Sequence, residues 1–236
     1  MKAIILAAGN STRYGENKLL TKFLGKTLPE YNIDFCIEND ITEIYVSVSK
    51  AQTIIKDGKA INPIVENIKK YKADKKVNIS FKYQDTDKYG PAAGLLPWLN
   101  KIDDSVLVLF GDNFLKGKFD KELLKEYDAI ATYKELKQNK DNTRFGAIDD
   151  ITLIEKPHDI TKGKFFCGFS YYTKKGFMNL NLLKPSLLRN EYEITEFFNS
   201  IEKRNITPVV KYWIDLTYKS EDKKILKFIK ESQTQN

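Results

Sequence analysis

Arg13 and Lys18 lie in a polar loop directly after a short apolar run, residues 3–8, and both side chains suit the binding of phosphate groups. The loop reads GNSTRYGENK over residues 9–18, and its small residues let backbone N–H groups surround an anion. The two cations add the charge that a polyphosphate needs. We therefore expect a triphosphate cradle made by these cations with Ala8, Gly9, Asn10, Ser11 and Thr12. An ordinary polar turn with a surface arginine is the alternative.

Two common phosphate loops do not match this segment. The dinucleotide pattern GxGxxG requires a glycine where the chain has Ser11, and the P-loop requires Gly-Lys-Ser/Thr where it has Gly15-Glu16-Asn17. Neither of these two patterns can therefore be used to assign the loop.

Two aspartates follow apolar runs that predict strands, and they are candidate ligands for a hard cation. Asp112 comes after residues 106–110, and Asp215 comes after Trp213 and Ile214. Mg²⁺ takes oxygen ligands, often one or two carboxylates with phosphate oxygens and water. Asp112 alone could equally be a turn residue. Lys156, just before a proline, is placed to bind a second phosphate, or it is a surface lysine.

Strands and helices alternate in the first half of the chain, which predicts a doubly wound, Rossmann-like α/β sheet. Strands are predicted at 3–8, 44–48, 77–83 and 106–110, the first and last of them continuous apolar runs. Helical spacing predicts a helix at 61–71, the length of a mixed pattern favours one at 28–39, and further helices are expected at 92–99 and 121–127. Strands with little helix between them at 129–133, 145–148, 151–154 and 165–172 predict an antiparallel extension. We expect the chain to close with helices at 193–203 and 220–231 around a strand at 209–214.

Composition favours one globular domain. The 236 residues are 42% hydrophobic and 30% charged, and the net charge of +7 comes from lysines spread along the chain rather than from one basic stripe. We therefore expect no nucleic-acid partner. No apolar stretch approaches the ~20 residues of a membrane span, so we expect a cytoplasmic protein without a membrane partner. Cys36 and Cys167 form no metal-binding cluster, and buried reduced thiols are expected.

Short motifs recur in a fixed order along nearly the whole chain. They are Ala7-Ala8-Gly9 with Thr12-Arg13, Gln84, Gly90-Pro91-Ala92-Ala93, Gly111-Asp112-Asn113, Arg144-Phe145-Gly146, Glu155-Lys156-Pro157, Gly168, Glu193-Ile194-Thr195 and Trp213-Ile214-Asp215. This ordered set resembles the sugar-phosphate nucleotidyltransferase family, most closely the glucose-1-phosphate thymidylyltransferase type. The resemblance implies the nucleotide-diphospho-sugar transferase fold in a single domain, 1–236, with a nucleotide-binding half (1–127) and a sugar-phosphate-binding half (128–236).

The resemblance also implies an activity and a set of roles. A nucleoside triphosphate, with dTTP or UTP favoured and CTP possible, would react with a sugar 1-phosphate to release pyrophosphate, in nucleotide-sugar and polysaccharide biosynthesis. Asp112 and Asp215 would hold Mg²⁺, Lys18 would neutralise the reacting phosphates, and Lys156 would bind the sugar phosphate. The other implied residues are Gln84 and Gly90 at the base, and Gly146, Glu155, Gly168, Tyr171 and Glu193 around the sugar. A homo-oligomer is a further expectation from the family.

The phosphate loop departs from the family pattern. Ser11 stands where the family has glycine, Asn17 stands where it has proline, and only four residues separate Arg13 from Lys18. This compact loop is similar to that of isoprenoid-pathway cytidylyltransferases or molybdenum-cofactor guanylyltransferases. Two alternatives thus stay open: a cytidylyltransferase acting on a non-sugar phosphate, and a catalytically silent nucleotide-binding module with a regulatory role.

Overall fold

Four parallel strands form the centre of the molecule. The computed structural model describes residues 1–85, 87–208 and 211–234. Strands β1 (Lys2–Ala7), β4 (Glu43–Val48), β7 (Asn78–Tyr83) and β8 (Val106–Phe110) pair in the order β8-β1-β4-β7. All four strands were expected from sequence. The apolar runs of β1, β4 and β8 are typical of strands buried on both faces, whereas β7 at the sheet edge alternates apolar and polar residues.

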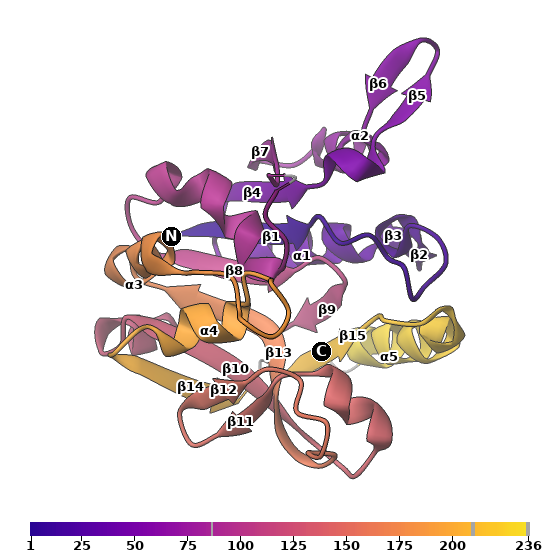
Figure 1. The fold of residues 1–236 in the computed structure, drawn as a ribbon. Helices are drawn as coiled ribbons and strands as arrows, with labels where there is room; N and C mark the ends of the chain where they lie inside the picture. Colours follow the sequence, from indigo (N-terminus) through magenta and orange to yellow (C-terminus); the bar gives the residue numbers. More distant parts are fainter. Residues whose placement is uncertain (86, 209–210, 235–236) are drawn as a thin grey trace.

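An antiparallel extension continues the sheet beyond β8 (Figure 1). It contains β10 (Ala129–Leu136), β11 (Ala147–Asp149), β12 (Thr152–Ile154), β13 (Gly163–Tyr172) and β14 (Arg204–Pro208), and β14 alone among these described strands pairs parallel, with β10. The long strand β13 joins the two parts, because it pairs antiparallel with β8, β10 and β11. The prediction of a doubly wound α/β sheet with a small antiparallel extension is confirmed.

In the described residues, three two-stranded ribbons lie outside the main sheet. They are β2 (Lys22–Phe23) with β3 (Lys26–Thr27), β5 (Ile54–Lys56) with β6 (Lys59–Ile61), and β9 (Asn113–Lys116) with β15 (Tyr212–Asp215). The β5–β6 hairpin projects from the molecule (Figure 1). The expected strand at 209–214 lies partly outside the described residues, and its described part is β15. The ribbon β9–β15 brings the C-terminal part of the chain beside the end of β8.

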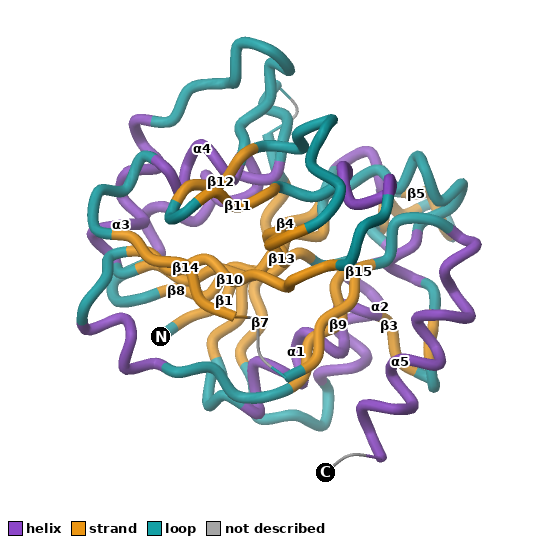
Figure 2. The backbone as a smooth tube through the Cα atoms, turned by 90° about the horizontal axis from the view of Figure 1, so that it is seen from below, coloured by secondary structure: helices purple, strands orange, loops and turns teal. Residues whose placement is uncertain are grey.

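Helices cover both faces of the sheet, as Figure 2 shows from below. They are α1 (Leu28–Glu38), α2 (Pro63–Lys72), α3 (Lys174–Met178), α4 (Ile194–Asn199) and α5 (Asp222–Thr234). Buried residues of α1 and α2 pack in one core cluster with one face of the sheet, and those of α3 and α4 pack in a second cluster on the other face. Helix α5 packs with the β9–β15 ribbon and α1 in a third cluster.

Some predicted helices differ in type or length. Residues 91–101 and 121–125 form 3₁₀ helices rather than the α-helices expected at 92–99 and 121–127, and Pro97 removes an N–H donor inside the first of them. Helix α4 ends at Asn199, short of the expected residue 203. No helix among the described residues is both long and apolar enough to cross a bilayer. Both cysteines are free and buried, as expected.

Candidate functional site

The phosphate loop leaves β1 at the carboxyl edge of the sheet and folds back around Ser11. The carbonyl oxygen of Ser11 accepts hydrogen bonds from the N–H groups of Tyr14 (3.0 Å) and Gly15 (3.2 Å), and its hydroxyl accepts one from Lys18 N (3.3 Å). Ser11 has a φ of 55°, in the left-handed region that favours glycine. The serine therefore adopts a backbone conformation that glycine would adopt without strain, at the place where the family has glycine.

The loop presents unpaired backbone donors. In the described part of the chain, none of the N–H groups from residues 8 to 13 has a hydrogen-bond acceptor. Unpaired N–H groups beside a left-handed residue form the kind of concave nest that binds anions. The structure thus has the donor array expected of a phosphate cradle.

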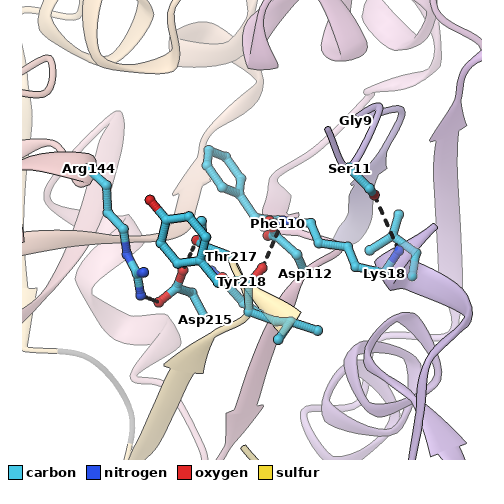
Figure 3. Close-up of polar contacts among 12 residues, drawn as sticks. Gly9, Ser11, Lys18, Phe110, Asp112, Arg144, Asp215, Thr217 and Tyr218 are labelled. Carbon is cyan, nitrogen blue, oxygen red and sulfur yellow. Dashed lines mark hydrogen bonds and ion pairs between the residues drawn. The ribbon is translucent and has the colours of Figure 1, made fainter. Parts of the chain in front are cut away.

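Lys18 connects this loop to the end of β8. Its Nζ donates to Asp112 Oδ2 (2.6 Å) and to the carbonyl oxygen of Leu216 (2.7 Å), and the N–H of Leu216 donates to the carbonyl oxygen of Asp112 (3.0 Å). Figure 3 shows this ion pair at the centre of the site. Lys18 and Asp112, which were each expected to act at the reacting phosphates, are therefore in direct contact.

Asp215 lies beside Asp112 because β15 pairs antiparallel with β9, with Asp215 opposite Asn113. Its Oδ1 accepts a hydrogen bond from Arg144 Nη2 (3.0 Å), and its Oδ2 accepts one from Thr217 Oγ1 (2.7 Å) (Figure 3). Burial raises the pKa of Asp215, Arg144 opposes that shift, and the nearby Asp112 carboxylate adds to it. The two aspartates thus repel each other across the ribbon, as two ligands of one cation would.

The two carboxylates suit a magnesium ion better than a transition metal. No group of three or more His, Cys, Asp or Glu side chains able to hold a metal occurs in residues 1–85, 87–208 and 211–234. Mg²⁺ commonly takes only one or two protein carboxylates and completes its shell with water and substrate phosphates. Asp112 and Asp215 fit that requirement, whereas the thiolate and imidazole ligands of a zinc site are lacking among those residues.

Two adjoining pockets open at this edge of the sheet and share Lys18, Pro91, Phe110 and Asp112. The first, called here the β1 pocket, has a volume of about 370 Å³ and is also lined by Ala8, Gly9, Asn10, Gln84 and Gly90. The second, the β13 pocket, has a volume of about 310 Å³ and is also lined by Ser11, Thr12, Arg13, Arg144, Gly146, Glu155, Lys156, Gly168, Thr195 and Asp215. The structure therefore brings together most of the site residues expected from sequence.

At the β1 pocket the structure fixes Gln84 and Gly90. Gln84 Nε2 donates to the carbonyl oxygen of Lys88 (2.8 Å), which orients the amide. Gly90 has a φ of 98°, and a Cβ there would lie 2.6 Å from the carbonyl oxygen of Tyr192. Tyr192 N in turn donates to Tyr89 O (2.7 Å). The segment before α4 therefore packs on this wall, and only glycine fits at position 90.

At the β13 pocket Glu155 is the centre of a polar cluster. Its Oε1 pairs with Lys156 Nζ (2.8 Å) and Arg189 Nη1 (2.9 Å), and its Oε2 accepts a hydrogen bond from Thr195 Oγ1 (3.0 Å). Lys156 has a φ of 38°, a strained value for a residue other than glycine. Such strain at a residue lining a pocket is typical of functional sites.

Two residues expected around the sugar lie elsewhere. Tyr171 does not line the pocket: its ring is buried beside Phe119 and Phe169, and its hydroxyl donates to the carbonyl oxygen of Asp120 (3.3 Å). Side chains alternate between the two faces of a strand, so Tyr171 lies on the same face of β13 as Phe169, two residues before it, and both belong to one core cluster. Glu193 lies buried next to the pocket rather than in its lining. Burial raises the pKa of Glu193 to about 7, and the nearby Glu155 adds to this.

Two arginines without a role assigned from sequence belong to the site. Arg144 bridges Asp215 and Glu221 Oε1 (2.9 Å), with its guanidinium stacked on the rings of Phe145 and Tyr218 at 4.8 and 5.5 Å. Arg189 holds Glu155 from an exposed loop. In the sequence, Arg144 stands directly before Phe145-Gly146 and Arg189 stands shortly before Glu193, and these positions were the signals that could have pointed to the site. Their ion-pair partners could not be read from sequence, because they come from distant segments.

Comparisons with known proteins agree with this geometry. Residues 3–139 match the MobA-like NTP transferase domain family. The chain is 28% identical over 225 residues to the bifunctional protein GlmU of Hydrogenobaculum sp. (strain Y04AAS1), covering 83% of this chain. It spans about half the length of that relative, 45%.

Solved structures share the fold. A putative glucose-1-phosphate thymidylyltransferase from Bacillus anthracis, crystallised with sucrose, superposes with a TM-score of 0.78 at 22% identity, covering 96% of this chain and 94% of that one. UDP-glucose pyrophosphorylase complexed with UDP-glucose superposes with a TM-score of 0.73 at 17% identity, covering 100% of this chain and 99% of that one. These likenesses confirm the predicted fold. Because the family match covers more than half of the chain, this protein belongs to the MobA-like NTP transferase domain family and is a nucleotidyltransferase.

Proposed function

We propose that this nucleotidyltransferase joins a sugar 1-phosphate to a nucleoside triphosphate, with dTTP or UTP favoured, and releases pyrophosphate. The observation that carries the proposal is the pair of adjoining pockets that share Lys18 and Asp112. One pocket carries unpaired backbone donors, and the other carries a lysine and a carboxylate cluster. Two phosphorylated substrates bound in them would meet at the shared residues.

The β1 pocket suits the nucleotide. Unpaired N–H groups from residue 8 onward would hold the phosphates, and Lys18 would balance their charge. Gln84 donates one hydrogen of its amide to Lys88 O, so its Oε1 and its second hydrogen can serve a base. An acceptor beside a donor complements the imide N–H and carbonyl of uracil or thymine. The same acceptor and donor can also pair with the amino group and N3 of cytosine, so Gln84 alone does not separate CTP from UTP or dTTP, and the preference for dTTP or UTP comes from the family resemblance.

The β13 pocket suits the phosphorylated acceptor. Lys156 Nζ and the exposed guanidinium of Arg13 supply positive charge for its phosphate. The Glu155 carboxylate and the Thr195 hydroxyl can bind sugar hydroxyl groups. Gly146 and Gly168 also line this pocket, and only glycine fits at position 168, since a Cβ there would lie 2.7 Å from Asn113 Nδ2. This polar lining favours a sugar over a non-sugar phosphate.

Asp112 and Asp215 would hold Mg²⁺. The bound ion would offset charge on the phosphates during transfer. The chain's own contribution is to orient both carboxylates: Lys18 donates to Asp112 and Arg144 donates to Asp215. Lys18 also lines both pockets, so it is placed to reach a phosphate in either.

The proposed reaction needs no protein nucleophile. An oxygen of the acceptor phosphate attacks the α-phosphorus in line, the bond to the β-phosphate oxygen breaks, and pyrophosphate leaves with the electron pair. Positioning and electrostatic stabilisation then provide the catalysis. Cys167 lines the β13 pocket, but burial raises the pKa of its thiol and its Sγ donates to Phe165 O, so it stays a neutral thiol.

A substrate panel tests the proposal. The purified protein is incubated with MgCl₂, one of dTTP, UTP, CTP, GTP or ATP, and glucose 1-phosphate, galactose 1-phosphate, N-acetylglucosamine 1-phosphate or phosphocholine. Pyrophosphate release is followed, and the nucleotide product is identified by mass spectrometry. We expect release with dTTP or UTP and a sugar 1-phosphate, and a loss of it in Lys156→Met.

Three results would contradict the proposal. Turnover only with phosphocholine and CTP would assign the protein to cytidylyl transfer onto a non-sugar phosphate. Nucleotide binding without turnover across the panel would favour a silent binding module. Full activity of Lys156→Met would remove the acceptor pocket proposed here.

A further inference from the structure

A 3₁₀ turn, Lys50–Gln52, lies between β4 and the projecting β5–β6 hairpin, and its last residue contacts the phosphate loop. Gln52 Nε2 donates to the carbonyl oxygens of Ala7 (3.0 Å) and Gly9 (3.0 Å). Gln52 Oε1 accepts a hydrogen bond from Ser49 N (3.0 Å). Both N–H groups and the oxygen of this amide are therefore hydrogen-bonded, which fixes its orientation.

These contacts determine which way two peptide groups of the loop face. In a trans peptide the carbonyl of one residue and the N–H of the next point in opposite directions. With the carbonyls of Ala7 and Gly9 held by Gln52, the N–H groups of Ala8 and Asn10 point away from it. Ala8, Gly9 and Asn10 line the β1 pocket, whereas Gln52 lines a neighbouring hollow that Gly9 and Asn10 also border. Among the described residues, the N–H groups of Ala8, Gly9 and Asn10 have no acceptor.

We propose that Gln52 is a positioning residue of the nucleotide site: it holds the Ala7 and Gly9 carbonyls away from the β1 pocket so that the next N–H groups face the phosphates. A carbonyl turned toward a polyphosphate would place the negative end of its dipole against the phosphate oxygens, whereas an N–H group donates a hydrogen bond to them. The assignment rests on the proposed function only in that the loop binds the triphosphate. Glycine at position 9 makes such a peptide rotation easy when nothing restrains it.

A purely structural role is the competing explanation, because Gln52 also takes part in a capping box with Ser49. The two roles use different atoms. Capping uses Gln52 Oε1 and the Ser49 hydroxyl, which accepts from Ala51 N (3.1 Å), whereas loop positioning uses Gln52 Nε2. Gln52→Glu keeps an acceptor for Ser49 N but removes both donors, and Ser49→Ala weakens the cap without touching the loop.

The experiment measures equilibrium binding of Mg²⁺·UTP, Mg²⁺·dTTP and inorganic tripolyphosphate by calorimetry, without acceptor. Two neutral hydrogen bonds are lost in Gln52→Glu, and we expect roughly tenfold weaker binding of each ligand. Gln52→Met, which has a similar shape and no donor, is expected to show the same loss. Ser49→Ala is expected to bind as the wild type does. In turnover assays, KM for the triphosphate is expected to rise while KM for the acceptor stays unchanged.

Wild-type affinity in Gln52→Glu and Gln52→Met, with both variants folded by circular dichroism, would overturn the inference. An equal loss in Ser49→Ala would also overturn it, in favour of capping. A wild-type protein that binds neither triphosphates nor tripolyphosphate would overturn the proposed function as well. If the wild type binds these ligands and the Gln52 variants bind them equally well, only the inference about Gln52 is overturned and the proposed function stands.

Discussion

Lys18 Nζ lies 2.6 Å from Asp112 Oδ2, and this ion pair joins the phosphate loop after β1 to the end of β8. The two residues are 94 positions apart but lie at adjacent strand ends, because β1 and β8 are parallel neighbours in the sheet. Both line both pockets. The pair therefore stands where the two proposed substrates would meet.

Asp112→Asn should reduce turnover roughly 100-fold or more, the loss seen when a charge-stabilising group is removed from an active site. The amide binds Mg²⁺ more weakly than the carboxylate does and no longer balances the positive charge of Lys18. The fold should persist, because the Asp112 side chain is 28% exposed. Pyrophosphate release and thermal unfolding measure the two effects. Asp104→Asn, which affects an exposed pair with the N-terminus, is the control. Near-normal turnover in Asp112→Asn would remove the metal assignment.

Much of this arrangement follows from sequence. Short apolar runs identified β1 and β8, and the carboxyl ends of parallel strands gather polar residues that follow them, which is why Lys18 and Asp112 could be expected together. Contacts between remote segments could not be derived in this way. Arg144 reaches Asp215 only because β15 pairs with β9, a short ribbon with no periodic signal of its own.

The errors also have physical reasons. Tyr171 was assigned to the sugar pocket by resemblance, but its place on β13 turns its ring into the core beside Phe169. The β5–β6 hairpin was not expected, although Asp57-Gly58 between short β-branched stretches is a hairpin signal. Ile61 belongs to that hairpin and not to the helix, which begins at Pro63.

Arg144→Met should destabilise the protein by about 3 kcal/mol, because it leaves the largely buried carboxylates of Asp215 (12% exposed) and Glu221 (15% exposed) without their cation. Urea unfolding at pH 7 measures the change. Adding Glu221→Gln should recover part of the loss by removing one of the two charges. Lys125→Ala, which breaks an exposed pair with Glu122, should cost less than about 0.5 kcal/mol. Equal losses in Arg144→Met and Lys125→Ala would refute a buried role for Arg144.

Glu193 should make stability depend on pH. Burial, with a contribution from Glu155, raises its pKa from 4.5 to about 7. Within the described part of the chain neither of its carboxylate oxygens has a hydrogen-bond partner, although Arg189 Nη1 lies 3.1 Å from Oε1. Below pH 4.5 folded and unfolded chains both hold the proton. As pH rises toward 7 the unfolded chain releases it first, so this contribution to stability falls, by up to about 3 kcal/mol.

Glu193→Gln removes this titration, so its stability should change less than that of the wild type between pH 5 and pH 8. Urea midpoints across that range measure it, with Glu202→Gln on the exposed surface as the control. Parallel curves for wild type and Glu193→Gln would show that Glu193 does not titrate there.

Ser11 allows a test of the loop conformation itself. Its φ of 55° costs an L-residue about 1 kcal/mol, and a β-branched side chain tolerates this region least. Ser11→Gly relieves that strain but loses the hydroxyl that accepts from Lys18 N, so we expect stability within about 1 kcal/mol of wild type. Ser11→Val should lose more than Ser11→Ala and should weaken triphosphate binding, because the loop must leave the left-handed conformation that gathers its N–H groups. Urea unfolding and calorimetric titration with Mg²⁺·UTP measure both. If valine were tolerated as well as glycine, the left-handed turn at Ser11 would not be what shapes the cradle, and the serine in place of the family's glycine would have no conformational meaning.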